Sequence, residues 1–372
     1  MKYPILWLFC GCFFAGCSSP KEKNVPKEND KLYLLASAYS DGTTPGIVVY
    51  NFDTQTGDFE YVSEVNGILN PSFLAVSPDE QFVYSVNETA NGAVNSFTFD
   101  KTTGMLGLVN HQFTDGADPC YINVDPDGTF LLTANYNGGN VSVFPLNEKK
   151  CIHPLSQNIA FTSESHIHTV VFSPDEKRVL VTDLGADKIY QFYVMYTPDG
   201  LPLLREDQTV DLERGSGPRH LAFHPNGNFL YCINELSGMV QVFDYDEGIR
   251  CSRQTIASDT TPGIGRKGCA DIHLTPDGKF LYASNRLKAD GIAIFSVNPE
   301  DGHLTKIGYQ ETGIHPRNFT LSPNGKFLLC ANRDSNNIQI FEIDSISGLL
   351  RNTGKEIQQD QPVCLKWVKK EK

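Results

Sequence analysis

The sequence predicts an all-β fold, a seven-bladed β-propeller whose blades have four strands each. The composition favours strands and turns, because 11% of the 372 residues are aromatic, only 20% are charged, and the chain has 31 Gly and 21 Pro. A proline-centred turn recurs along the chain with a period of about 50 residues, which is typical of propeller blades. Strand-like segments at the two ends of the chain combine into one further blade.

The repeated turn defines six of the blades. Its copies are Ser77-Pro78-Asp79, Asp125-Pro126-Asp127-Gly128, Ser173-Pro174-Asp175, His224-Pro225-Asn226-Gly227, Thr275-Pro276-Asp277-Gly278 and Ser322-Pro323-Asn324-Gly325. The turn prolines are 48, 48, 51, 51 and 47 residues apart. Each turn separates two short alternating segments, such as residues 73–76 and 82–86, as in a β-hairpin. Two further strands fit before the next copy, so each unit has four strands.

The seventh blade is predicted to be a composite of both chain ends. Residues 32–38, 46–51 and 59–65 are strand-like but lack a first strand, and residues 363–368 supply one. Pairing the C-terminal strand into the N-terminal blade closes the ring and removes its exposed edges. The predicted propeller domain spans residues 31–369.

The N-terminus is predicted to be a targeting segment. Residues 1–17 read as a bacterial lipoprotein signal peptide, with an apolar run at 5–14 and two small residues before Cys17, the expected site of lipidation. An ordinary signal or anchor helix is the alternative, but ten apolar residues are too few to span a bilayer. Polar residues 18–30 are expected to form a flexible tether. We therefore expect a lipid-anchored protein of the bacterial cell envelope, on its periplasmic or surface side.

Charge and cysteine spacing exclude several classes of partner. The formal net charge of −13 makes nucleic acid an unexpected partner. Three of the ten cysteines precede residue 18, and the other seven show neither CxxC nor Cys/His spacing, which argues against a disulfide framework and a zinc site. Asp183 and Asp187 lack the compact acidic loop of a calcium site. No P-loop, dinucleotide-binding or GxSxG motif is present, so neither a metal nor a cofactor is predicted.

Offsets from the turn prolines indicate where function lies. Ten residues after each proline stand Glu88, Tyr136, Leu184, Glu235, Arg286 and Arg333, and six residues before it stand Ser72, Cys120, His168, Arg219, Ala270 and Arg317. Both sets fall at the end of the hairpin opposite the turn, on the two strands nearest the axis, so we expect them to surround one mouth of the central channel. Each residue of the first set follows an Asn or Asp, whose side chain is expected to bond neighbouring backbone where the strand ends.

The residues that differ between copies are the functional candidates. His168, Arg219, Glu235, Arg286 and Arg317 come from four successive blades and should form one arc. Arginines beside one histidine and one glutamate suit an anionic small molecule, because guanidinium groups bind carboxylate or phosphate and the neighbours transfer protons. A structural salt-bridge network in a wet channel is the alternative. His220 and His224 are expected to be packing or turn residues.

At these residues the sequence resembles the lactonase family of seven-bladed propellers, which includes propeller-type 6-phosphogluconolactonases and the related carboxy-muconate lactonising enzymes. The matching stretches are His166-Ile167-His168, Phe172-Ser173-Pro174-Asp175, Asp183-Leu184-Gly185-Ala186-Asp187, Gly217-Pro218-Arg219-His220, Asn234-Glu235-Leu236, Ser284-Asn285-Arg286 and Pro316-Arg317. They extend in order through the whole predicted domain, from about residue 32 to about residue 368.

The resemblance implies that His168, Arg219, Glu235 and Arg286 are catalytic. We expect Arg317, Glu88, Tyr136 and His166 to contribute to substrate binding, with Arg286 and Arg317 on an anionic group of the substrate. Arg219 would stabilise the oxyanion as water attacks a lactone carbonyl, with Glu235 or His168 as general base.

The substrate is expected to be a small anionic or sugar lactone. An exported enzyme would meet few phosphorylated sugars, so an unphosphorylated aldonolactone is the alternative to 6-phosphogluconolactone. Two further functions fit the same residues, namely a lactone-forming cycloisomerase and a non-catalytic carbohydrate-binding or scaffold propeller. A monomer with no membrane contact beyond the lipid anchor is expected.

Overall fold

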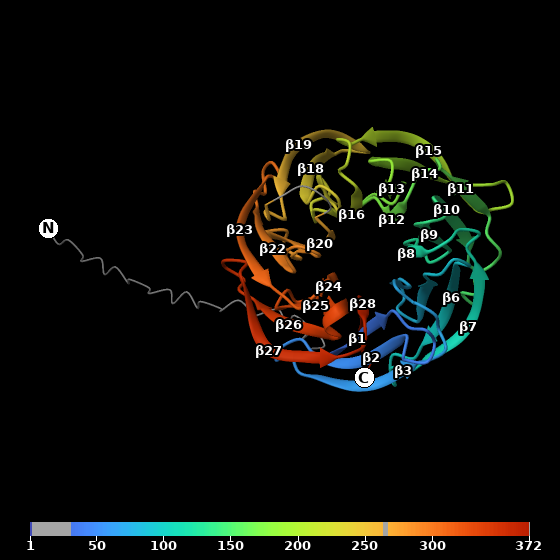
Figure 1. Ribbon diagram of the computed structural model, residues 1–372, viewed down its shortest axis with the longest axis horizontal. Coiled ribbons are helices and arrows are strands. Elements are labelled where there is room, and N and C mark those ends of the chain that lie inside the picture. Colours follow the sequence, from blue (N-terminus) through green and yellow to red (C-terminus); the bar gives the residue numbers. More distant parts are fainter. Residues whose placement is uncertain (2–30, 263–266, 372) are drawn as a thin grey trace.

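The computed structural model describes Met1, residues 31–262 and residues 267–371. The predicted signal peptide, its Cys17 and the tether at 18–30 lie, Met1 apart, outside the described residues. The described strands form seven antiparallel four-stranded sheets around a central axis (Figure 1), so the predicted seven-bladed propeller is confirmed. No helix among the described residues is long and apolar enough to cross a membrane.

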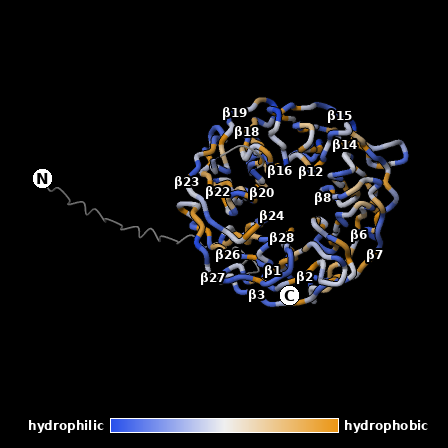
Figure 2. The backbone as a smooth tube through the Cα atoms, in the orientation of Figure 1, coloured by the Kyte–Doolittle hydropathy of each residue, from blue (hydrophilic) through white to orange (hydrophobic). Residues whose placement is uncertain are grey.

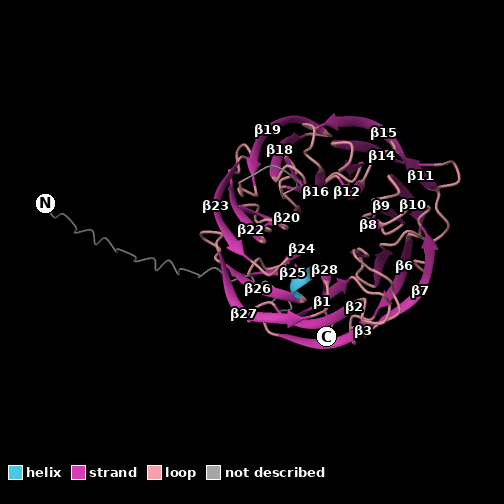
Figure 3. Cartoon of the chain, viewed as in Figure 1, coloured by secondary structure: helices cyan, strands magenta, loops and turns pink. Residues whose placement is uncertain are grey.

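The blades follow one another in chain order. The composite blade contains β28 (Pro362–Lys369), β1 (Lys31–Ala38), β2 (Ile47–Asp53) and β3 (Phe59–Val65). The first blade after it contains β4 (Leu74–Val76), β5 (Phe82–Asn87), β6 (Ala93–Phe99) and β7 (Leu106–Phe113). The second contains β8 (Pro119–Val124), β9 (Phe130–Asn135), β10 (Asn140–Pro145) and β11 (Gln157–Ala160). The third contains β12 (Ile167–Phe172), β13 (Arg178–Asp183), β14 (Lys188–Tyr196) and β15 (Pro202–Asp211). The fourth blade contains β16 (Pro218–Phe223), β17 (Phe229–Asn234), β18 (Met239–Tyr245) and β19 (Ile249–Ala257). The fifth contains β20 (Cys269–Leu274), β21 (Phe280–Asn285), β22 (Gly291–Val297) and β23 (Leu304–Glu311). The sixth contains β24 (Pro316–Leu321), β25 (Phe327–Asn332), β26 (Asn337–Ile343) and β27 (Leu350–Gln358). A short 3₁₀ helix, η1 (Arg333–Ser335), is the only helix in the described part of the chain (Figure 3).

The ring closes as predicted. Strand β28 pairs antiparallel with β1, with Leu32 opposite Lys369 and Ala36 opposite Leu365. The predicted C-terminal strand at 363–368 is therefore confirmed and is one residue longer at each end.

The core lies between neighbouring blades. The second strands are almost wholly buried, and hydrophobic residues recur along the strands of every blade (Figure 2). One cluster, for example, joins Leu132 of β9 to Val181 of β13 in the next blade. The outermost strands instead alternate between exposed and partly buried positions. Burial on both faces of the inner strands fixes their register and so fixes the height of each side chain along the axis.

The repeated turns lie together on one face of the ring. The hydroxyl of Ser77 accepts a hydrogen bond from the backbone N–H of Phe82 at 2.9 Å and donates to Asp79 at 2.5 Å, and Ser173 and Ser322 make equivalent contacts. Because every first strand ends and every second strand begins at this turn face, the opposite ends of these strands form the other face, which we call the mouth face.

Candidate functional site

A β-bulge presents the functional side chains at the mouth face. In five blades the pairing of the first and second strands shifts register at the residue six before the turn proline. The bulged positions are Cys120, His168, Arg219 and Arg317, and in the fifth blade the bulge takes in both Ala270 and Asp271. A bulge re-aims a side chain out of the regular alternation of a strand. The spacing identified these positions, but the bulge itself was not predicted.

The predicted arc surrounds a cavity of about 150 Å³ on the axis side of the mouth face. Its lining consists of Glu88, Cys120, Tyr136, His168, Glu235, Arg286 and Arg317. Arg219 lies directly behind Glu235 and is bonded to it. The structure thus brings together His168, Arg219, Glu235, Arg286 and Arg317 from four blades, as the offsets predicted.

Other members of the predicted ring do not line the cavity. Leu184 and Ala270 are buried and apolar. Arg333, on η1, donates to its neighbour Asp334 and contacts His315 at 3.2 Å. Ser72 is buried but is also absent from the lining.

Glu235 is held by two arginines. Nε of Arg219 and Nη2 of Arg286 both donate to its Oε2 atom, at 3.1 Å and 3.0 Å. Both guanidinium groups are buried, and burial lowers the pKa of Arg219 and of Arg286, with the charge of the neighbouring arginines adding to the effect. A guanidinium stays charged at neutral pH, so Glu235 is the counterion that makes these two buried cations tolerable.

Arg317 lies on the other side of the cavity with different partners. Its Nη2 donates to Oε2 of Glu88 at 3.4 Å, and its guanidinium lies over the ring of Tyr39 at 5.4 Å. The Tyr39 hydroxyl donates to Oε1 of Glu88 at 2.9 Å. Burial alone would lower the pKa of Arg317, but Tyr39 and Glu88 raise it. Tyr39 was missed because the composite blade has no turn proline to count from, although it directly follows the second strand of its blade, as Glu88 does.

His168 is the buried imidazole that lines the cavity. It is 3% exposed, and burial and the charge of Arg219 hold its pKa well below 6.5, so the imidazole is neutral at pH 7. Its Nδ1 atom is buried and has no hydrogen-bond partner among the described residues. The edge of Tyr136 packs against it, and Tyr136 in turn stacks on His166 at 4.5 Å. His166 therefore supports Tyr136 and does not line the cavity.

The charges at the cavity leave an excess of positive charge. Three guanidinium groups, those of Arg219, Arg286 and Arg317, face the two carboxylates of Glu235 and Glu88. With His168 neutral, these five side chains carry one net positive charge, and the buried carboxylate of Asp271, which also acts on Arg219, lies behind them and is bonded to His220. Such a site favours an anion or a negative charge that develops during a reaction. The thiol of Cys120 is not an activated nucleophile, because burial raises its pKa.

The repeated Asn and Asp residues have a structural role, but the predicted partner is correct only in part. Asp183 accepts hydrogen bonds from the backbone N–H groups of His166 and Ala186. Asn135 instead donates to the hydroxyl of Ser142 at 2.9 Å on the third strand, and Asn332 reaches Asn337 at 3.0 Å in the same way. An amide both donates and accepts, so it links the ends of the second and third strands through side chains.

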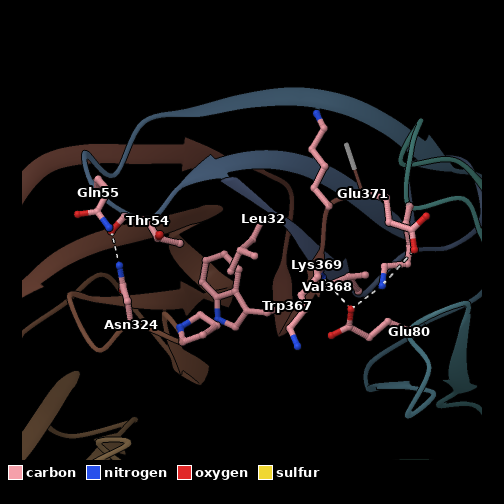
Figure 4. Close-up of a pocket in the computed structure, with 12 residues that line it drawn as sticks. Leu32, Thr54, Gln55, Glu80, Asn324, Trp367, Val368, Lys369 and Glu371 are labelled. Carbon is pink, nitrogen blue, oxygen red and sulfur yellow. Dashed lines mark hydrogen bonds and ion pairs between the residues drawn. The ribbon is translucent and has the colours of Figure 1, made fainter. Parts of the chain in front are cut away.

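A larger cavity of about 360 Å³ lies on the turn face, where the two ends of the domain meet (Figure 4). Leu32, Trp367 and Val368 form its apolar wall. Its polar groups bond one another: Lys101 pairs with Glu80 at 3.0 Å, and Asn324 donates to the backbone oxygen of Thr54 at 2.8 Å. It lacks the combination of buried cations, carboxylates and neutral imidazole found at the mouth face. In the described ranges no cluster of three His, Cys, Asp or Glu side chains could hold a metal ion.

Comparison with known proteins relates this fold to one family. A family model described as lactonase, seven-bladed β-propeller, matches residues 33–367. A protein named 6-phosphogluconolactonase from Formosa agariphila is 38% identical over 327 residues, which cover 84% of this chain and 92% of the relative.

Two solved structures have the same architecture. A candidate 6-phosphogluconolactonase from Bacteroides fragilis is 45% identical with a TM-score of 0.87, covering 91% of this chain and 98% of its own. A periplasmic gluconolactonase from Pseudomonas aeruginosa is 31% identical with a TM-score of 0.86, covering 92% of this chain and 100% of its own.

Proposed function

The chain belongs to the lactonase family of seven-bladed β-propellers, and we propose on that premise that it hydrolyses the ring ester of a sugar-acid lactone to the open acid. The observation that carries the proposal is the arrangement at the mouth face. Two buried arginines share one oxygen of Glu235, next to a neutral and buried histidine. Lactone hydrolysis needs a base for water and a cation for the developing oxyanion, and this site has both.

The reaction needs one proton to move twice. His168 takes a proton from water as the water oxygen bonds to the lactone carbonyl carbon. The carbonyl oxygen becomes an oxyanion, stabilised by the guanidinium groups of Arg219 and Arg286. When the intermediate collapses, the bond to the ring oxygen breaks and that oxygen receives the proton from His168. The products are the open hydroxy acid and an unchanged enzyme.

We assign the base to His168 because of what each candidate already binds. Oε2 of Glu235 accepts from two guanidinium groups, so both lone pairs of this oxygen are already occupied. Nδ1 of His168 has no partner in the described part of the chain, and its lowered pKa keeps the imidazole neutral. Glu235 then acts by holding Arg219 and Arg286 in place.

The substrate class follows from the charge of the cavity and from the relatives. Among the described residues no lysine lines the cavity, and Arg317 makes fewer internal hydrogen bonds than Arg219 or Arg286. Arg317 is therefore the group best placed to bind a polar or anionic tail of the lactone. The related proteins are named for a phosphorylated and an unphosphorylated gluconolactone, and we propose a lactone of this kind.

We also propose that the protein is anchored in the cell envelope through Cys17. Lys31 begins β1 at the turn face, since Leu32 pairs with Lys369 at the end of β28. The similar Pseudomonas protein is described as periplasmic. A Cys17→Ser variant should move from the membrane fraction to the soluble fraction, and unchanged fractionation would refute the anchor.

The test of the function is acid release from 6-phosphogluconolactone and from gluconolactone, corrected for spontaneous hydrolysis. Glu235→Gln and Arg286→Ala should each lose about 100-fold or more in kcat/KM, as for loss of a group that orients or stabilises the oxyanion. Exposed Glu60 on the outer strand β3 provides the control, and Glu60→Gln should keep full activity. No acceleration of either lactone by the wild type would refute the proposal.

A further inference from the structure

A second layer of side chains lies directly beneath the site, inside the channel. It is formed by the residues five positions before the turn prolines, Phe73, Tyr121, Thr169, His220, Asp271 and Asn318. Their contacts cross the axis, because Phe73 of the first blade stacks on Tyr121 at 4.1 Å and also lies 6.1 Å from the ring of His220 in the fourth. This layer, which we call the floor, lies behind the residues that line the cavity and is aromatic on one side and charged on the other.

His220 connects this floor to the site. Its Nε2 lies 3.2 Å from Nη1 of Arg219, and its Nδ1 lies 2.7 Å from Oδ1 of Asp271. A guanidinium only donates, so Nε2 of His220 must be the acceptor and its proton must be on Nδ1, donated to Asp271. Burial and the charge of Arg219 lower the pKa of His220 to about 4, in agreement with a neutral ring.

Asp271 is itself fixed by further donors. Oδ1 also accepts from the backbone N–H of Ile272 at 3.0 Å, and Oδ2 accepts from Asn318 at 2.5 Å and from the backbone N–H of Phe319 at 3.3 Å. His273 contacts Oδ2 at 3.0 Å. A buried carboxylate with this many partners does not move, so it determines which nitrogen of His220 carries the proton.

We infer that Asp271 and His220 are positioning residues for Arg219, through the chain Asp271, His220, Arg219 and Glu235. Asp271 fixes the tautomer of His220, and the lone pair on Nε2 of His220 aims the guanidinium that meets the developing oxyanion. The backbone oxygen of Ala270 accepts from the same Nη1 at 2.7 Å, so His220 and Ala270 together hold both of its hydrogens. The expected effect on kcat rests on the proposed lactone hydrolysis. The expected tautomer of His220 does not depend on it.

The tautomer is measured without any substrate. Long-range proton–nitrogen spectra of the imidazoles, with His220 assigned by its absence in His220→Gln, should show Nδ1–H and an unprotonated Nε2 at pH 7. In Arg219→Ala the Nε2 resonance of His220 should shift, because its donor is gone. An Nε2–H tautomer, a charged ring, or no response to Arg219→Ala would overturn the inference, even if the protein hydrolysed no lactone.

The kinetic test compares two replacements of one side chain. His220→Phe keeps a ring against Phe73 and Tyr121 but removes the acceptor for Arg219, while Asp271 keeps its other donors. His220→Gln retains an amide oxygen that can accept from Arg219. We expect kcat to fall roughly 10–100-fold in His220→Phe with little change in KM, and to return to within about threefold of wild type in His220→Gln.

Two controls separate positioning from stability. His224→Gln alters a buried histidine of the same blade at the turn face and should leave kcat unchanged. In an Arg219→Ala background, His220→Phe should cause no further loss, because both residues act through one group. Equal activity of His220→Phe and wild type, or a full additional loss in the double variant, would overturn the inference.

Discussion

Arg219 and Glu235 are joined side chain to side chain, Nε to Oε2 at 3.1 Å, from adjacent strands of one blade. Arg219 extends from the bulge in β16, and Glu235 follows the end of β17. Arg286 reaches the same oxygen from the next blade at 3.0 Å. One carboxylate therefore links two blades and neutralises part of the charge of two buried cations.

This arrangement predicts a large stability cost for removing the carboxylate. Glu235→Ala leaves two buried guanidinium groups without their shared acceptor, and breaking a buried ion pair in this way costs about 3–5 kcal/mol. Glu235→Gln retains an acceptor oxygen and should cost less. Urea unfolding measures the free energy of unfolding of each variant. Exposed Glu60→Ala is the control, and an equal effect of Glu60→Ala and Glu235→Ala would contradict the counterion role.

Arg317 should discriminate between substrates. Its partners are Glu88 and Tyr39, whereas Arg219 and Arg286 share Glu235. If it binds the tail of the lactone, Arg317→Gln should raise KM for 6-phosphogluconolactone by about tenfold or more, since a charge-assisted bond contributes about 1.5–3 kcal/mol. KM for gluconolactone should change less. Equal increases in KM for both lactones would assign Arg317 to the reacting ring.

The sequence predicted the architecture because turn chemistry repeats once per blade. Proline spacing gave the number of blades, and the incomplete N-terminal unit gave the closure by β28. The offsets from the turn prolines also predicted the height of His168, Arg219 and Glu235 along the axis. The spacing does not show which side chains extend into the cavity, however, since Leu184 and Ala270 occupy the same repeat positions and are buried in the core.

Other parts of the site required the structure for definite physical reasons. Tyr39 belongs to the blade without a turn proline, so no offset pointed to it. His220 was expected to be a packing or turn residue, and it does pack against Phe73 and Tyr121. Its bond to Asp271 crosses from the fourth blade to the fifth, and no spacing within a single repeat predicts such a contact.

The activity should persist at acid pH. The pKa of His168 is well below 6.5 because of burial and the positive charge of Arg219, so the neutral, proton-accepting form remains dominant as the pH falls through 6.5. Lactone hydrolysis, corrected for the spontaneous rate at each pH, should therefore be nearly constant from pH 7 to pH 6. His168→Gln should lower kcat by about 100-fold or more. A half-maximal rate near pH 6.5 would contradict a buried neutral base.

Stability, in contrast, should fall as the medium becomes acid. The folded-state pKa of His220 is lowered to about 4 from 6.5, so below pH 6.5 the unfolded chain binds a proton that the folded chain does not. At pH 5 this difference destabilises the fold by about 2 kcal/mol relative to pH 7. Thermal melting of wild type and His220→Gln from pH 7 to pH 5 measures it, and the variant should show the smaller decline. Parallel declines in both proteins would show that His220 is not the group responsible.

Ring closure by β28 should be essential for cooperative folding. Removing residues 362–372 deletes the innermost strand of the composite blade, including buried Cys364 and Leu365, and leaves β1 with an unpaired edge. An open edge exposes backbone donors and acceptors and promotes association between chains. We expect the truncated chain to lose its sharp thermal transition and to elute as aggregates in size-exclusion chromatography. A chain lacking only residues 371 and 372 should melt as the wild type does, because β28 ends at Lys369. If the longer truncation melted at the wild-type temperature as a monomer, the six remaining blades would be stable without closure of the ring.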